Sequence, residues 1–217
     1  MQRNDNRVCY HCEADGPTRE HVPPKCLFPK GADWSGLITV PSCAAHNNAT
    51  SAADEYLKFL LGAVVPGVPD AITSSAARDA VRLALRGSRK IHRFGFAWVG
   101  KALDIGQTFT IDYGLLSMCL SRVARALYFH HTDHRQKLLC DLHVWPLFIP
   151  LKSHPDPSFV ATVESIRALI ARDFATFPKH GPHQEAFAYQ IVKKYGVTIV
   201  NMKFYGKHWF SVAGETG

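Results

Sequence analysis

The sequence predicts an α+β protein. A zinc-containing module over residues 1–65 is followed by a mixed α+β domain over residues 70–217 that ends in an antiparallel meander. Three observations predict this organisation. Cysteine and histidine pairs with the spacing of metal ligands bracket two β-like segments near the N-terminus. A stretch containing Pro66, Gly67 and Pro69 then marks a linker. Three β-like runs separated by glycines close the chain.

The composition is that of a folded, globular chain. Of its 217 residues, 47% are hydrophobic and 20% are charged, which provides enough apolar surface for a core. The polar N-terminus does not read as a signal peptide, and no apolar run is long enough to cross a membrane. We therefore expect a cytoplasmic protein with no membrane partner. In that reducing compartment the six cysteines favour metal binding or burial over disulfides.

The net charge of +7 is unevenly distributed. Residues 1–60 hold six Lys/Arg and seven Asp/Glu, whereas the rest of the chain holds 19 basic and 11 acidic side chains. If the partner is a polyanion, residues 61–217 supply most of the attraction to its phosphates. An ordinary basic surface explains the same numbers, so charge alone leaves both interpretations open.

The N-terminal module is expected to fold as strand, loop, strand and helix. Pro23 and Pro24 stop the first strand, and Pro41 ends the second, which is β-branched and apolar. Ser42 is then a candidate N-cap for the helix. The expected elements are a strand over 18–22, a strand over 37–40 and a helix from about 43 to 61.

A second helix is predicted from residue 74 or 75 to about 93, and it has two dissimilar faces. Placed at 100° per residue, the cations fall on one side, and the other side holds Ala77, Ala80, Val81, Ala84 and Ile91. Like charges one turn apart repel, and a polyanionic partner would relieve that repulsion. Two interpretations of this face stay open: it contacts nucleic-acid phosphates, or it is only solvated. The cations are Arg78, Arg82, Arg86, Arg89, Lys90 and Arg93.

The remaining chain alternates strands and helices. The histidine-rich stretch 130–134 is interpreted as a polar helix end, because no further metal-ligand pair lies near it in sequence. Gly196 and Gly206 sit at the two turns of the terminal meander. The predicted strands are 95–98, 107–111, 142–149, 186–193, 197–205 and 208–212, and the predicted helices are 112–131 and 158–174.

Cys9-x-x-Cys12 and Cys43-x-x-His46 predict a structural zinc site. Soft thiolates and one imidazole at these spacings suit tetrahedral zinc, and a strand–strand–helix layout lets the two pairs converge. In so small a module the metal would contribute much of the folding free energy. An alternative ligand set uses Cys26 in place of His46. Of the other cysteines and histidines, Cys119 and Cys140 are expected in the core, and His11 is expected at the surface.

A second group of polar residues lies between the two zinc pairs. Glu20 and His21 precede the proline turn, and neighbours on a strand point to opposite faces. At a strand end one of them can still hold a cation while the other faces water. Asn47 directly follows His46 and can offer an amide oxygen to the same cation.

The order of these motifs resembles that of the HNH (ββα-metal) endonucleases over residues 8–60. The resemblance implies that His21 is the general base, and that Glu20 and Asn47 bind a catalytic Mg²⁺ or Mn²⁺. It also implies a structural Zn²⁺, with His46 in place of the family's usual last cysteine. Products would carry 5′-phosphate and 3′-hydroxyl ends.

The sequence departs from the family pattern in two places. The asparagine that orients the base has no counterpart, since Leu37 and Ile38 occupy the matching positions; Thr39 or a backbone carbonyl is left for that role. The basic residue often found after the final motif is also absent from residues 49–51.

The expected function is therefore that of a metal-dependent endonuclease acting on DNA. Cleavage of RNA and formation of a homodimer are left open. A restriction, phage-defence or mobile-element setting is an analogy with the family. One alternative is a non-catalytic, zinc-containing nucleic-acid-binding protein. Another is a partner-binding or assembly protein whose basic surface is only solvated.

Overall fold

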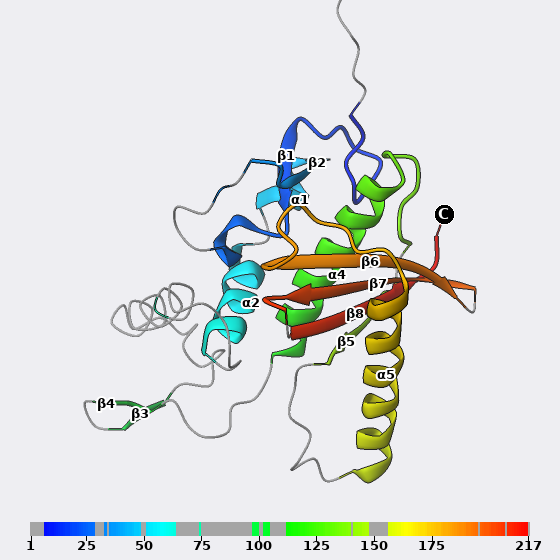
Figure 1. The fold of residues 1–217 in the computed structure, drawn as a ribbon. Coiled ribbons are helices and arrows are strands. Elements are labelled where there is room, and N and C mark those ends of the chain that lie inside the picture. The colour runs from blue at the N-terminus through cyan, green and yellow to red at the C-terminus, as the bar shows by residue number, and fades with distance from the viewer. Residues whose placement is uncertain are drawn as a thin grey trace, which may run out of the picture. The chain divides into compact units, whose positions relative to one another are not determined.

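A computed structural model shows a mixed α+β fold that forms two compact units (Figure 1). The first unit consists of Met1–Pro23, Trp34–Asn48 and Leu120–Gly217, and the second of Pro24–Asp33 and Ala49–Cys119. The expected division into residues 1–65 and 70–217 stays a prediction. The structure describes residues 7–28, 33, 35–48, 51–63, 74, 97–99, 102–104, 112–139, 141–147, 156–194, 196–206 and 208–216.

The N-terminal part of the first unit is a two-stranded antiparallel sheet followed by a helix. Strand β1 (Thr18–Val22) pairs with β2 (Ile38–Ser42), and α1 (Ala44–Asn48) follows. The predicted first strand is confirmed, and it ends at Val22, directly before Pro23. The register places Glu20 opposite Val40 and His21 opposite Thr39.

Two predicted boundaries in this part are wrong. Strand β2 continues through Pro41 to Ser42, because proline lacks only an N–H donor and its carbonyl still accepts a hydrogen bond from the N–H of Tyr10. Ser42 is therefore a strand residue and not a helix cap. The single helix expected over 43–61 is found as α1 and a separate α2 (Ser51–Ala63).

The second unit contains α2, the short 3₁₀ helix η1 (Lys25–Leu27) and a hairpin of β3 (Ala97–Val99) and β4 (Ala102–Asp104). Helix α2 buries Tyr56, Leu57, Leu60 and Leu61 completely. The predicted helix over 74–93, with its stripe of six cations, lies outside the described residues apart from Ser74, and so does the predicted strand over 107–111.

Two long helices accompany the C-terminal sheet. Helix α4 (Tyr113–His131) and helix α5 (Pro157–Thr176) confirm the predictions over 112–131 and 158–174. Asp156 caps α5, since its carboxylate accepts hydrogen bonds from the N–H groups of Ser158 and Phe159. No helix among the described residues has the length and hydropathy needed to cross a membrane.

The C-terminal sheet has the strand order β5-β8-β7-β6 and is antiparallel throughout. Its strands are β5 (His143–Pro146), β6 (Phe187–Lys194), β7 (Val197–Phe204) and β8 (His208–Gly214). The predicted meander is thus confirmed, with Gly196 and Gly206 in the left-handed region at its turns. Strand β5 is shorter than the expected 142–149.

Alternation along the strands gives this sheet two buried faces. On one face, Val200, Met202 and Phe210 are fully buried, and Lys193 lies over the ring of Tyr128 from α4. On the other face, Trp145 and Trp209 pack against Val163, Ile170 and Phe174 of α5. Figure 1 shows α4 behind the sheet and α5 in front of it.

Candidate metal centre

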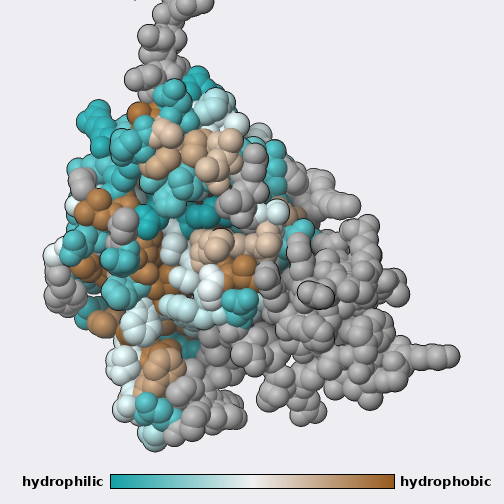
Figure 2. All heavy atoms as spheres, turned by 180° about the vertical axis from the view of Figure 1, so that it is seen from behind, coloured by the Kyte–Doolittle hydropathy of each residue, from teal (hydrophilic) through white to brown (hydrophobic). Residues whose placement is uncertain are grey.

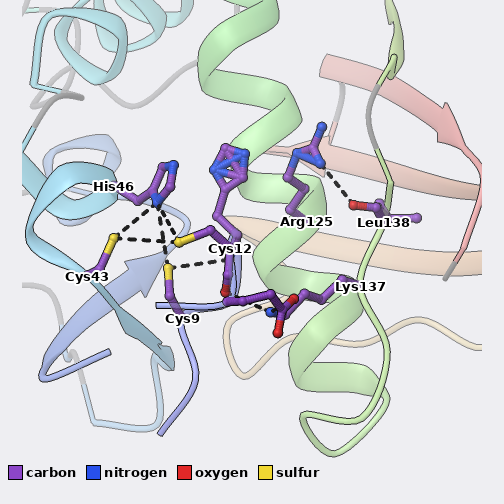
Figure 3. Close-up of polar contacts among 9 residues, drawn as sticks. Cys9, Cys12, Cys43, His46, Arg125, Lys137 and Leu138 are labelled. Carbon is purple, nitrogen blue, oxygen red and sulfur yellow. Dashed lines mark hydrogen bonds and ion pairs between the residues drawn. The ribbon is translucent and has the colours of Figure 1, made fainter. Parts of the chain in front are cut away.

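Four ligand atoms from two distant segments converge at the start of α1 (Figure 3). The sulfurs of Cys9, Cys12 and Cys43 and a ring nitrogen of His46 all lie within 4.8 Å of one another. The Nδ1 atom of His46 is 3.1, 3.5 and 3.7 Å from the sulfurs of Cys43, Cys12 and Cys9. A tetrahedral zinc ion, with Zn–S of about 2.3 Å and Zn–N of about 2.0–2.1 Å, separates its ligand atoms by roughly 3.5–3.8 Å. The cluster could therefore hold a zinc ion.

The first ligand pair lies on a loop that is fixed to β2. The N–H of Cys9 donates to the carbonyl of Ala14 at 2.8 Å and closes the loop, and the N–H of Tyr10 donates to the carbonyl of Pro41 at 2.9 Å. Gly16 is buried where the loop passes β2: a Cβ on it would lie 2.9 Å from the Cβ of Pro41. Only glycine fits this approach.

The second ligand pair is placed by the junction of strand and helix. Cys43 directly follows β2, and His46 lies three residues further along, in α1. The N–H of His46 donates to the carbonyl of Cys43 at 3.1 Å, which closes the first turn. Residues three apart in a helical turn share a face, so both side chains point toward the N-terminal loop.

The surroundings of Cys9 and His46 favour the forms that bind zinc; at Cys12 a backbone hydrogen bond from Ala14 lowers the pKa, but burial and the thiols of Cys43 and Cys9 outweigh it and raise the pKa. Burial opposes ionisation of Cys9, but backbone hydrogen bonds from His11, Cys43 and Cys12 outweigh it and lower the pKa of the Cys9 thiol. Burial, together with the positive charges of Arg122 and Arg125, lowers the pKa of His46. A thiolate and a neutral imidazole are the forms that bind zinc.

The alternative ligand Cys26 is not in the cluster. Its thiol contacts the carbonyl of Asp54 at 3.8 Å, within the second unit. Burial, and then the charge of Asp54, raise the pKa of Cys26 to about 12. The cluster instead contains His46, as the first ligand set predicts.

Glu20 occupies a different environment from the one expected of a metal ligand. Its carboxylate accepts a hydrogen bond from Nη2 of Arg122 in α4 at 2.8 Å, and both side chains are about nine-tenths buried. The Nε of Arg122 also lies 3.4 Å from the hydroxyl of Tyr10. Glu20 thus joins β1 to α4 through a buried ion pair.

His21 and Asn47 lie on the two elements that flank the metal cluster. His21 alternates with Glu20 along β1 and is half-buried opposite Thr39. The amide nitrogen of Asn47 donates to Oγ1 of Thr18 at 2.9 Å, and the hydroxyl of Thr18 donates to the carbonyl of Ser42 at 2.6 Å. The first bond joins α1 to β1, and the second joins β1 to β2.

Further residues of the site come from the C-terminal half of the chain and gave no signal in the sequence. The Nζ of Lys137 donates to the carbonyl of Cys12 at 2.7 Å and pairs with Glu13 at 2.8 Å. Arg125 donates to the carbonyls of Leu138 and Leu139. Figure 3 shows Arg125 and Lys137 beside the metal loop. His11, expected at the surface, is instead partly buried against the ring of His46, at a centroid distance of 4.0 Å.

Within the described ranges, the Cys9–Cys12–Cys43–His46 group is the one set of three or more His, Cys, Asp or Glu side chains arranged to hold a metal ion. Comparison with protein families, with curated proteins and with solved structures found no match to this chain. The structure therefore defines a mixed α+β fold and a site able to hold zinc.

Proposed function

We propose that the chain is a metal-dependent endonuclease that hydrolyses DNA phosphodiester bonds by a one-metal HNH mechanism. One observation carries the proposal: a cluster suited to zinc joins the loop before β1 to the junction of β2 and α1, and this same strand–strand–helix unit carries His21 and Asn47. A restriction, phage-defence or mobile-element role would suit such an enzyme, by analogy with the family.

His21 is the proposed general base. In its neutral form the imidazole accepts a proton from the attacking water. Directly opposed residues on paired strands have Cβ atoms about 4.5–5.5 Å apart, and the register opposes His21 to Thr39. We therefore assign to Thr39 the orienting role that an asparagine takes in the family.

Asn47 and Glu20 are the proposed ligands of Mg²⁺ or Mn²⁺, because amide and carboxylate oxygens are the hard donors that these ions prefer. The ion would stabilise the negative charge that grows on the phosphate and the leaving oxygen. The bond from Asn47 to Thr18 holds the amide beside β1. Glu20 would have to contribute while it is paired with Arg122, or exchange that partner for the metal.

The Glu20–Arg122 ion pair favours a second candidate function. A carboxylate that is nine-tenths buried against a guanidinium has a structural role without any metal. The chain would then be a non-catalytic, zinc-containing protein that binds nucleic acid. A salt-dependent affinity for duplex DNA, with no cleavage, is the outcome that this second function predicts.

Incubation of supercoiled plasmid with zinc-loaded protein, with and without added Mg²⁺ or Mn²⁺, tests the proposal. We expect nicked or linear plasmid from the wild type only when the added metal is present. His21→Ala should abolish cleavage and Thr39→Val should slow it, whereas His143→Ala, at an exposed position on β5, should cleave normally. Cleavage by His21→Ala at the wild-type rate would overturn the assignment.

A varied panel of DNA and RNA separates the two candidate functions. If the wild type binds members of the panel but cuts none of them, the binding-protein function replaces the nuclease. Zinc content and circular dichroism of each variant should match the wild type, so that lost cleavage reports chemistry and not unfolding.

A further inference from the structure

Three segments of the first unit bring histidines and a lysine together at the C-terminal end of α4. The ring of His131 in the last turn of α4 meets the ring of His180 edge to face, at a centroid distance of 4.8 Å. His180 is fixed to β6 by two backbone hydrogen bonds with Tyr189, of 2.9 and 3.0 Å. From the end of the same strand, the ammonium of Lys193 lies 5.8 Å from the ring centroid of Tyr128, one turn before His131.

These side chains face solvent. His130, His131, His134 and Lys193 are exposed and His180 is partly exposed. We call these five residues the α4-end surface. Figure 2, which views the molecule from behind, shows hydrophilic side chains predominating in the upper part of that face.

The α4-end surface gathers one ammonium group and four imidazoles. Among the described residues, none of its five members forms an ion pair with a carboxylate. Burial, then the charges of His180 and His130, lower the pKa of His131, and only Asp133 opposes them by raising it. A phosphate beside these rings would oppose this shift and favour the protonated imidazole, in which both ring nitrogens donate.

We propose that the α4-end surface binds the phosphate backbone of a nucleic acid. Imidazole and ammonium N–H groups are suitable donors to phosphate oxygens. The donors come from three separate segments and lie on an open surface, which fits an extended polyanion better than a single small phosphate.

The α4-end surface belongs to the same compact unit as the candidate metal centre. Helix α4 also carries Arg122, which contacts Glu20 of β1. The segment that carries His180 approaches the start of β2, since a Cβ on Gly36 would lie 3.5 Å from Pro182. The proposed function requires a bound polynucleotide. The inference rests on that function and names the surface that holds the polynucleotide backbone.

The test measures affinity separately from cleavage. Binding of a fluorescein-labelled DNA duplex, and of an RNA duplex of the same length, is followed by anisotropy at several salt concentrations, in the His21→Ala background to prevent cutting. The triple variant His131→Gln, His180→Gln, Lys193→Gln should bind at least about tenfold more weakly than its parent at low salt, and the salt slope should fall by about one for the lost ammonium group of Lys193.

Two controls make the result specific to the α4-end surface. Arg172→Gln removes an exposed cation from α5 and should leave affinity nearly unchanged. Lys193→Arg keeps the charge and should retain binding, whereas Lys193→Glu should weaken it beyond Lys193→Gln. Unaltered affinity and salt slope in the folded, zinc-loaded triple variant would overturn the proposal, as would the absence of any nucleic-acid binding by the parent.

The outcomes separate this inference from the proposed nuclease. A wild type that binds through the α4-end surface but never cleaves keeps the inference and removes the nuclease. A wild type that cleaves, together with a triple variant of unchanged affinity, keeps the nuclease and removes the inference.

Discussion

The guanidinium of Arg122 in α4 lies 2.8 Å from the carboxylate of Glu20 in β1, and each side chain is about nine-tenths buried. The two residues are 102 positions apart in sequence. This contact ties the strand that carries His21 to the helix that packs on the C-terminal sheet. It also gives Glu20 a partner that competes with any metal for its carboxylate.

Removing one member of this pair should destabilise the protein strongly. Arg122→Met leaves a buried carboxylate without its counter-charge, which typically costs about 3–5 kcal/mol. The double variant Glu20→Leu, Arg122→Met should recover much of that loss, because it leaves no buried charge unpaired. Urea unfolding of the zinc-loaded proteins measures the free energy of unfolding of the single and the double variant. Equal stability of the single and double variants would contradict a penalty for the unpaired buried carboxylate.

Zinc binding should depend on the four clustered ligands and not on the other described cysteines. Cys12→Ser and Cys43→Ser remove a thiolate from the cluster, so zinc retained after dialysis should fall far below the wild-type content. Cys26→Ser is the matched control and should retain zinc, since its thiol contacts Asp54 instead. Metal analysis together with protein quantification gives the molar ratio of zinc to protein. Loss of zinc from Cys26→Ser alone would restore the alternative ligand set.

The close approach at Gly16 should make the metal loop intolerant of a methyl group there. In Gly16→Ala the new Cβ would meet the Cβ of Pro41 at 2.9 Å and the backbone of Ser42 at 3.0 Å, so the loop or β2 must shift. We expect a loss of about 1–3 kcal/mol from this overpacking and weaker zinc binding, measured by competition with a chromogenic chelator. Ala14→Ser, at an exposed position of the same loop, should behave like the wild type.

Acidification should weaken the fold through His11. Burial, followed by the charges of His46 and Arg125, lowers the pKa of His11 to about 4, while an unfolded histidine titrates near about 6.5. Between these pH values the unfolded chain binds a proton that the folded chain does not. The contribution of His11 to the free energy of unfolding is therefore fully present above about pH 6.5 and is lost as the pH falls toward about 4.

Unfolding free energies at pH 7.5 and 5.5 would reveal this effect. Wild type should lose more stability between the two pH values than His11→Gln, which has no imidazole to protonate. Equal losses in the two proteins would show that His11 titrates normally.

Local patterns predicted the parts of the structure that depend on neighbours in sequence. Cys9-x-x-Cys12 and Cys43-x-x-His46 identified the metal cluster because ligand spacing within a loop or a helical turn is fixed by local geometry. The terminal meander followed from alternating apolar residues and from the glycines at its turns. Pro41 was misread, because the effect of a missing N–H depends on whether a strand partner requires it.

The sequence by itself therefore determined the ligands of the candidate metal site and the order of most strands and helices. Only the tertiary structure decided the surroundings of those ligands: Arg122 against Glu20, Lys137 against the carbonyl of Cys12, and His180 against His131. Such contacts join segments far apart in the chain. Their formation depends on how helices and strands pack into a common core, and no local spacing or periodicity encodes that packing.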